Sequence, residues 1–165
     1  MKHIIQLLVA IASSTYAVED NESNSTLELY VFGKSYHSNR SYNWNENNYG
    51  LGIGIDFPVM EDLPFTIMCM GGVYKDSYNE YAKFMVLGPR YTIGNTDAWH
   101  SSFSVGAGPF YGSDFNGLGY VGIFALGYEK ISICITGSVD TGPAKEGATS
   151  TNMIATFLKI RLMEF

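Results

Sequence analysis

The sequence predicts an all-β protein, an eight-stranded antiparallel transmembrane β-barrel that follows a cleaved signal peptide. Three observations lead to this fold class: a signal-like N-terminus, a period-two alternation of apolar residues, and the composition. The 165 residues include 12 Tyr, 10 Phe and 18 Gly, and only 16% are charged. No segment after the first 17 residues is apolar enough for a transmembrane helix, so a membrane-spanning form of this chain must be a closed barrel.

The first element is the N-terminal stretch MKHIIQLLVAIASSTYA, residues 1–17. Lys2 supplies a positive start, the run IIQLLVAIA has the length of a signal-peptide core, and Ala17 ends a plausible cleavage site. We therefore expect residues 1–17 to be a signal peptide. A short polar segment, 18–26, follows it, and residues 27–165 form the predicted barrel.

Alternating runs predict the first four strands, at residues 27–37, 49–58, 65–74 and 81–93. The alternation is clearest in YGLGIGIDFP, where Tyr49, Leu51 and Ile53 share one face and small or polar residues such as Asp56 share the other. The glycines of this run lack the G-x-G-x-x-G spacing and lie inside a strand pattern, which argues against a phosphate-binding loop.

Similar runs predict the last four strands, at residues 103–111, 119–128, 131–138 and 152–165. In ISICITGS, Ile131, Ile133 and Ile135 alternate with smaller residues. Turn-like segments such as GNTDAWH, GSDFNG and the long DTGPAKEGATST separate these strands. Eight strands make the smallest usual outer-membrane barrel.

The chain ends on Phe165, a frequent last residue of bacterial outer-membrane barrels, but Leu158 and Ile160 have the opposite phase. A bulge near the end of the chain would bring these residues onto one face. A soluble periplasmic β-barrel or sandwich is the alternative fold. Cys69 lies in the outward phase and Cys134 in the inward phase, so we expect no disulfide between them.

The net charge of −6 argues against a nucleic-acid partner, whose phosphates require a basic footprint. We expect no cofactor and no metal, and we expect the chain to be a monomer.

Three stretches carry a family resemblance: ELYVFGKSYH in the first strand, WNENNYGLGIG leading into the second, and YKDSYNEYAKFMVLGPRY leading into the fourth. They are similar to segments of the lipid A palmitoyltransferase (PagP) family, and the resemblance spans roughly residues 28–165. Members of that family are eight-stranded outer-membrane enzymes that move an acyl chain from a phospholipid donor onto lipid A. The resemblance implies a location in the bacterial outer membrane, with a gene of bacterial or phage origin, and lipid A or lipopolysaccharide as acceptor.

The resemblance also implies a catalytic set, because the family requires a histidine, an aspartate and a serine near the extracellular rim. These positions match His37, Asp76 and Ser77. Acyl transfer from an ester needs a hydroxyl activated by a base, and a histidine titrates in the range required of that base.

A further implied feature is an interior apolar slot for the acyl chain, with a glycine as its floor. A gapless count from the serine places that floor at Gly88, with Phe84 and Val86 as apolar neighbours and Arg90 close by. We expect Gly88→Met to shorten the transferred chain. The sequence departs from the family in two places: no amphipathic helix is expected before the first strand, and the loop at 38–48 is shorter. With these departures, hydrolysis, in which water is the acceptor, stays open as an alternative to transfer.

Three other functions remain open at this stage. A lipid A deacylase is also an eight-stranded barrel, and HSN at 37–39 resembles its His-x-Ser-Asn motif with the last two residues one place early. A non-enzymatic barrel for adhesion or structure would explain every strand and leave the His, Asp and Ser coincidence unexplained. The Asn-x-Ser/Thr triplets at Asn21, Asn24 and Asn39 would suit a glycosylated eukaryotic protein.

Overall fold

The computed structural model describes residues 24–38, 43–59, 64–113, 116–139 and 152–165. The expected signal peptide at 1–17, most of the polar segment at 18–26 and the long segment at 140–151 lie outside the described residues. Among the described residues, no helix is long and apolar enough to cross a membrane.

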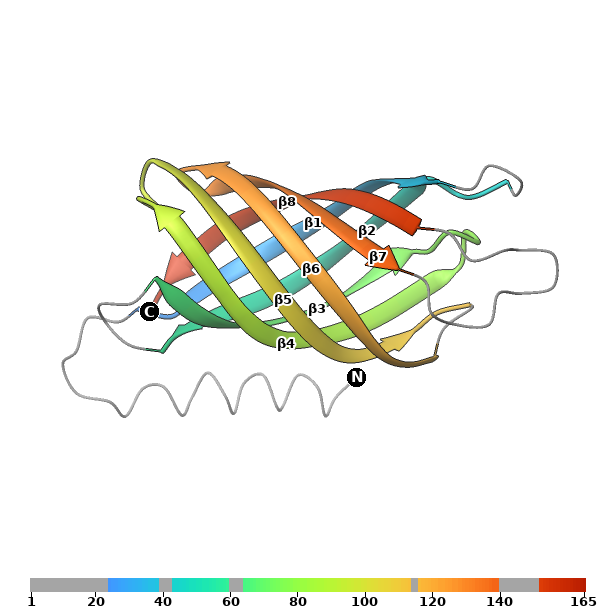
Figure 1. Ribbon diagram of the computed structural model, residues 1–165, viewed down its shortest axis with the longest axis horizontal. Helices are drawn as coiled ribbons and strands as arrows, with labels where there is room; N and C mark the ends of the chain where they lie inside the picture. Colours follow the sequence, from blue (N-terminus) through green and yellow to red (C-terminus); the bar gives the residue numbers. More distant parts are fainter. Residues whose placement is uncertain (1–23, 39–42, 60–63, 114–115, 140–151) are drawn as a thin grey trace.

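Eight antiparallel strands form one closed barrel, as the sequence predicts (Figure 1). Each strand pairs with the next along the chain, and the last pairs with the first. The strands are β1 (Thr26–His37), β2 (Asn47–Pro58), β3 (Phe65–Lys75), β4 (Tyr81–Gly94), β5 (Trp99–Tyr111), β6 (Asn116–Tyr128), β7 (Ile131–Val139) and β8 (Asn152–Glu164).

Strand β5 begins four residues before its expected start, and β6 begins three residues before. The connection from β4 to β5 closes within 95–98, where the amide of Ala98 donates to the carbonyl of Asn95 at 2.9 Å. Trp99 therefore already pairs with Tyr128. A tight turn of this kind uses fewer residues than the segment of turn-forming residues contains, so the remaining residues extend the paired strand.

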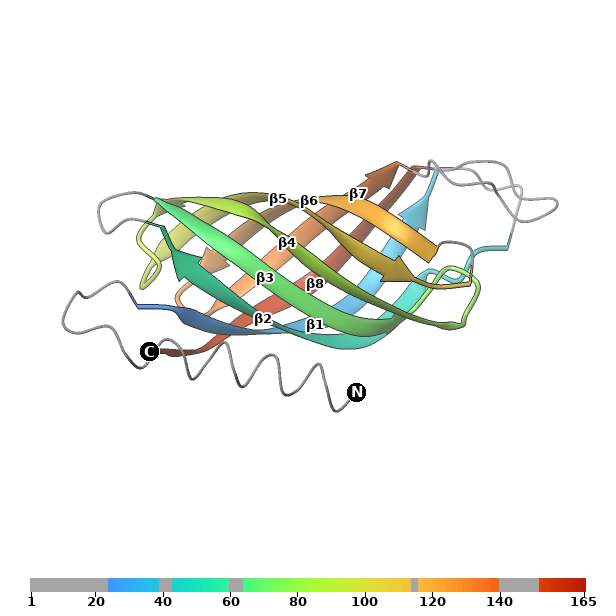
Figure 2. The ribbon, with the colours of Figure 1, turned by 90° about the horizontal axis from the view of Figure 1, so that it is seen from below.

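The two ends of the barrel differ, as Figures 1 and 2 show. One end, which we call the terminal end, carries the start of β1, the end of β8 and the connections 59–64, 95–98 and 129–130. The other end, which we call the loop end, carries the connections 38–46, 76–80, 112–115 and 140–151. The two longest connections, 38–46 and 140–151, are at the loop end, the pattern of barrels whose long loops face the cell exterior.

The alternation of side chains between the two faces of the wall is confirmed. In β2, Leu51 is 60% exposed on the outer face, and in β7 Ile133 is also 60% exposed. Their neighbours Gly52 and Ser132 are buried inside the barrel. Cys69 and Cys134 are both free, and Cys134 is buried within the barrel, in agreement with the expected opposite faces.

Two irregularities in β1 and β8 change which residues face inward. Between Phe32 and Ser35 the register of β1 shifts against both neighbouring strands. Tyr30 and Phe32 face the interior before this bulge, and Ser35 and His37 are buried after it. The bulge therefore turns His37 into the barrel, which regular alternation would have prevented.

The second irregularity lies at the end of β8 and confirms the bulge that the phase of Phe165 required. Leu27 pairs with Met163 while Glu28 pairs with Arg161, so Leu162 has no direct partner on β1. Met163 is exposed on the outer wall as a result. Phe165, two residues further, is joined to Ser25 by two backbone hydrogen bonds of 2.9 and 3.0 Å.

Candidate functional site

A cavity of about 710 Å³ occupies the loop half of the barrel interior. Its wall is largely apolar and includes Phe32, Phe84 and Phe110. The rings of Phe84 and Phe110 stack at 5.5 Å, and Phe32 meets Phe84 edge-on at 5.6 Å. The volume lies within the range of pockets that hold small ligands, and the lining suits a hydrocarbon chain.

His37 and Ser77 meet at the rim of this cavity. Ser77 Oγ lies 3.0 Å from His37 Nε2, although the two residues are 40 positions apart in the sequence. His37 is the last residue of β1, and Ser77 lies in the connection between β3 and β4. Both residues line the cavity. Ser35 Oγ is a longer second contact of the same histidine nitrogen, at 3.4 Å.

Aromatic packing fixes the plane of the His37 ring. Trp44 stacks on it with the ring centroids 4.8 Å apart and the planes 15° from parallel. Tyr78 in turn meets Trp44 edge-on at 5.4 Å. A ring held between a wall and a stacked indole has little freedom to rotate, so Nε2 stays directed at Ser77.

Asparagine side chains hold the serine segment in place. The side-chain Nδ2 of Asn45 donates to the carbonyl of Asp76 at 2.8 Å, and its backbone N–H donates to the carbonyl of Ser77, also at 2.8 Å. Asn48 Nδ2 donates to the carbonyl of Lys75 at 2.8 Å. These bonds join the start of β2 to the residues around Ser77, which positions the hydroxyl relative to His37.

Asp76 does not orient His37 in this arrangement. Its Oδ1 accepts hydrogen bonds from the amides of Tyr78 and Glu80 at 2.9 and 3.0 Å. Its Oδ2 accepts from the amide and the hydroxyl of Ser113 at 3.1 and 2.5 Å. Burial raises the pKa of this carboxyl, but the bonds from Ser113, Glu80 and Tyr78 outweigh burial and hold the pKa below its usual value. The carboxylate of Asp76 therefore joins the connection between β3 and β4 to the connection between β5 and β6.

Phe84 and Val86 line the cavity as expected, but Gly88 is not among the lining residues. A Cβ added to Gly88 would lie 2.0 Å from the carbonyl oxygen of Val105 and 2.6 Å from the Cα of Gly106. Gly88 thus marks a close approach between the backbones of β4 and β5. A larger side chain at Gly88 would press against the backbone of β5, and the role of Gly88 as the floor of the acyl slot stays a prediction.

The cavity ends instead on a packed layer of fully buried residues. Tyr30, Met68 and Cys134 are each 0% exposed, and none of them lines the cavity. Next to them, toward the loop end, lie residues of the same apolar cluster that line the cavity: Met70, Val86, Ile123 and Phe157. The floor of the cavity is therefore built from side chains of several strands.

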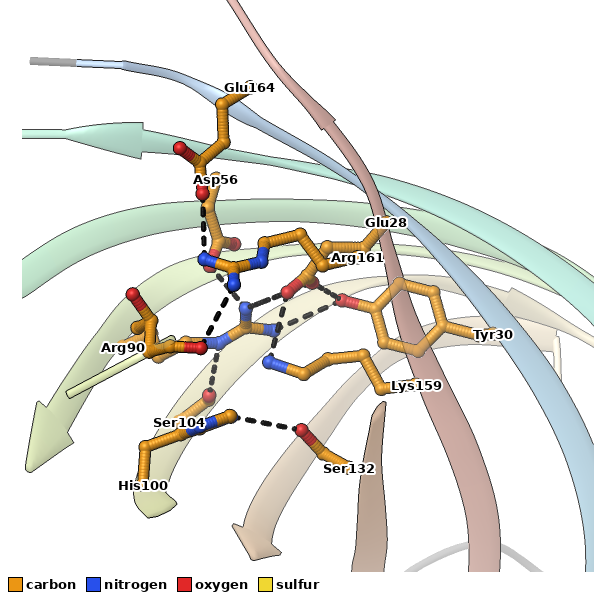
Figure 3. Close-up of polar contacts among 11 residues, drawn as sticks. Glu28, Tyr30, Asp56, Arg90, His100, Ser104, Ser132, Lys159, Arg161 and Glu164 are labelled. Carbon is orange, nitrogen blue, oxygen red and sulfur yellow. Dashed lines mark hydrogen bonds and ion pairs between the residues drawn. The ribbon is translucent and has the colours of Figure 1, made fainter. Parts of the chain in front are cut away.

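On the terminal-end side of the packed layer lies a cluster of buried charges, which we call the ionic layer: Glu28, Asp56, Arg90 and Lys159 (Figure 3). Arg90 Nη1 lies 2.9 Å from both oxygens of Glu28 and also contacts Asp56. Lys159 Nζ lies 2.9 Å from Glu28 Oε1. Two carboxylates thus face two cations in the interior, which makes the layer formally neutral.

The comparisons with known proteins concern the fold. No family model and no curated protein sequence matches the chain. The structure of Ail, the attachment invasion locus protein of Yersinia pestis in complex with the heparin analogue sucrose octasulfate, matches with a TM-score of 0.46. The identity is 12%, over 86% of this chain and 100% of that chain. This chain is an eight-stranded barrel that resembles Ail.

Sequence reasoning missed several members of the site. Trp44 and Asn45 lie in a loop without a periodic pattern, and Ser113 lies in a connection far along the chain. Their roles depend on contacts across the rim, for which a single sequence has no signal. Of the ionic layer, the inward phase of Asp56 and the position of Arg90 were visible in the sequence. Among the described residues, no group of three or more His, Cys, Asp or Glu side chains suits a metal ion.

Proposed function

We propose that this protein is an outer-membrane acyltransferase that moves a palmitate-like chain from a phospholipid to lipid A. The observation that carries the proposal is the contact of Ser77 Oγ with His37 Nε2 at the mouth of an apolar cavity. A hydroxyl beside a base is the arrangement that acyl transfer needs, and a chain-sized apolar cavity next to it accounts for the donor.

The proposed reaction exchanges one ester bond for another. The donor chain lies in the cavity, with its ester carbonyl at the rim beside Ser77. The bond from the acyl carbon to the glycerol oxygen breaks, and a bond to the acceptor hydroxyl forms. Ser77 Oγ takes the acyl group first, and its proton passes through His37 Nε2 to the lysophospholipid that leaves. The acceptor hydroxyl then takes the acyl group from Ser77, and its proton passes through His37 Nε2 back to Ser77 Oγ. His37 therefore acts as base and then as acid, and it regains its starting state in each cycle.

The wall between β6 and β7 suits entry of a lipid from the membrane. In the part of the chain that the structure describes, β7 pairs only with residues Gly122–Tyr128 of β6. Among the described residues, 116–121 of β6 pair with β5 alone. Leu118 and Tyr120 in this stretch are exposed and also line the cavity. A cavity that reaches an open strand edge would admit an acyl chain sideways, without exposing it to water.

The membrane location predicts the behaviour of the purified chain. The protein is expected to fractionate with the outer membrane and to migrate differently on gels when boiled, because a closed barrel with an apolar outer wall stays folded in detergent. Fractionation and unheated gel electrophoresis measure both properties. Recovery as a soluble folded protein without detergent would contradict the membrane location and leave the soluble barrel.

The depth of the cavity predicts the length of the transferred chain. Val86→Met fills volume at the floor, and excluding two methylenes at about 0.8 kcal/mol each would lower the preference for the longer donor by roughly 15-fold. Val86→Ala is expected to shift the preference toward longer chains. Mass spectrometry of lipid A after incubation with donors of mixed chain length measures both shifts.

Leu87→Met is the matched control, because Leu87 faces outward on the same strand and is exposed. It is expected to leave the chain distribution unchanged. An unchanged distribution in folded, active Val86→Met and Val86→Ala would show that the floor lies elsewhere. The substitution Gly88→Met is a weaker test, since it would first disturb the contact between β4 and β5.

A non-enzymatic barrel is the second candidate function, and the orientation of Asp76 favours it. A carboxylate that joins two loops is what a structural rim needs, and the carboxylate of Asp76 contacts Ser113, Tyr78 and Glu80. Lipid A from cells with and without the gene separates the candidates by mass. A gained acyl chain supports the transferase, a lost chain supports a deacylase, and an unchanged lipid A supports the structural barrel.

A further inference from the structure

The outer wall at the loop end carries two lysines beside the connection that holds Ser77. Lys75 is the last residue of β3 and pairs with Tyr81, and Lys83 of β4 pairs with Val73. These pairings place the two lysines as diagonal neighbours on one wall, a separation of roughly 7–8 Å between positions. Lys83 also pairs with Tyr111 of β5.

Tyrosine rings hold both ammonium groups. Lys75 Nζ lies 4.8 Å from the centroid of Tyr81, and Lys83 Nζ lies 5.6 Å from the centroid of Tyr111. Lys75 Nζ also donates to the carbonyl of Asn79 at 3.1 Å. Cation–π contacts of this kind restrain a flexible side chain while leaving its positive charge available.

Neither lysine has a carboxylate partner among the described residues, whereas Arg90, Lys159 and Arg161 each form ion pairs. Asp76, the acid next to Lys75 in the chain, has its carboxylate bonded to the amides of Tyr78 and Glu80 and to Ser113. Glu80 is exposed and forms no ion pair with either lysine. This leaves a pair of cations on the outer wall next to the rim. It is complementary to a phosphate group.

We propose that Lys75 and Lys83, framed by Tyr81 and Tyr111, bind a phosphate of the acceptor glycolipid, lipid A, in the outer leaflet. The choice of acceptor rests on the proposed function. The donor chain occupies the barrel interior, while the chains of the acceptor remain in the membrane outside the wall. A headgroup that reaches Ser77 from outside must cross this rim.

The cavity provides the link between this surface and the reaction. Lys83 and Tyr111 belong to the outer wall, yet both border the mouth of the cavity that Ser77 and His37 line. Lys75 precedes Ser77 by two residues. A phosphate bound at the lysines thus brings the neighbouring sugar hydroxyls of the same headgroup close to the donor ester, and the surface acts by positioning the acceptor.

Binding is tested without turnover, on the Ser77→Ala background refolded in detergent. The probes are purified lipid A with both phosphates and the same lipid A after phosphate removal, followed by native mass spectrometry. In Lys75→Gln/Lys83→Gln, we expect phosphorylated lipid A to bind about 30-fold more weakly, at a cost typical of two surface lysines. Dephosphorylated lipid A is expected to bind equally to both proteins.

Lys34→Gln is the matched control, because Lys34 is an exposed lysine on β1 near the same end of the barrel. It is expected to retain full binding. Unchanged binding in the double variant would overturn the proposal, and so would an equal loss for both lipid A forms. A lysine dependence seen only with phosphatidylglycerol vesicles would assign the surface to the donor and also overturn it.

Turnover in an otherwise unmodified chain separates this proposal from the proposed function. If Lys75→Gln/Lys83→Gln transfers acyl chains with an unchanged KM for lipid A, the acceptor surface is wrong and the acyltransferase stands. If the unmodified chain transfers no acyl group but binds phosphorylated lipid A through these lysines, the acyltransferase is wrong and the binding surface stands.

Discussion

Ser77→Ala is expected to reduce acyl transfer to lipid A by about 10³-fold or more, and His37→Ala is expected to do the same. Loss of a positioned base or of the hydroxyl it serves usually removes 10²- to 10⁴-fold of rate, and the two groups act as a unit across a single 3.0 Å contact. The double variant Ser77→Ala/His37→Ala should therefore be little worse than either single variant. Initial rates with a defined phospholipid donor measure this.

The opposite end of the barrel supplies a matched control. His100 Nε2 lies 3.2 Å from Ser132 Oγ, and both side chains are buried. This pair has the same chemistry but lies in a polar region, remote from the apolar cavity. Ser132→Ala is expected to retain transfer. A Ser77→Ala variant that keeps a tenth of the rate, or a Ser132→Ala variant that loses as much, would contradict the assignment of the site.

Asp76→Asn is expected to cost less than Ser77→Ala, because Asp76 acts on the reaction through the position of Ser77. The change weakens the bonds from Ser113, Tyr78 and Glu80 without removing the base or the hydroxyl. The ratio of the two losses is informative. Equal losses would mean that the carboxylate contacts the reacting groups directly during the reaction.

The strands and their faces were predictable because a β-strand repeats every two residues. In β2, the residues with the inward phase, including Gly52 and Asp56, are buried as that period requires. The free state of Cys69 and Cys134 follows from the same period. In a barrel with a single-layer wall, each side chain faces either outward or inward, so the alternation of polarity along the sequence shows the face directly. Neither an alignment nor a motif was needed for these features.

The rim was less predictable, because it depends on departures from that period. The bulge after Phe32 turns His37 inward, and a bulge is set by pairing with both neighbouring strands. The partner of Asp76 is Ser113, on a connection that no local pattern links to the β3–β4 loop. The expected role of Asp76 came from the family resemblance, and in this chain its carboxylate is bonded to Tyr78, Glu80 and Ser113.

The floor of the cavity shows the same limit. A gapless count placed it at Gly88, and Arg90 stood out as a charge that needed a partner. The structure supplies that partner from β1 and β2, as Glu28 and Asp56. An inward-facing charge on three different strands signals an interior ion cluster, although pairing could be assigned only from the closed barrel.

Arg90→Met is expected to destabilise the barrel by about 3–5 kcal/mol, because it removes one cation from the ionic layer. Arg90 is 3% exposed and contacts Glu28, Asp56, Tyr30 and Ser104. Without it, two buried carboxylates face Lys159 alone. The free energy of unfolding is measured from urea titrations in lipid vesicles, followed by the gel mobility of the unheated protein.

A second substitution separates charge imbalance from lost packing. Arg90→Met/Asp56→Asn leaves Glu28 paired with Lys159 at 2.9 Å, so the layer is again neutral, and most of the lost stability is expected to return. Arg161→Met is the control, since its partners Asp97 and Glu164 are 81% and 43% exposed and each such pair is worth at most about 1 kcal/mol. If the double variant is no more stable than Arg90→Met, the guanidinium acts through its hydrogen bonds to Tyr30 and Ser104. In that case the ionic layer is stabilised by hydrogen bonds and not by charge balance.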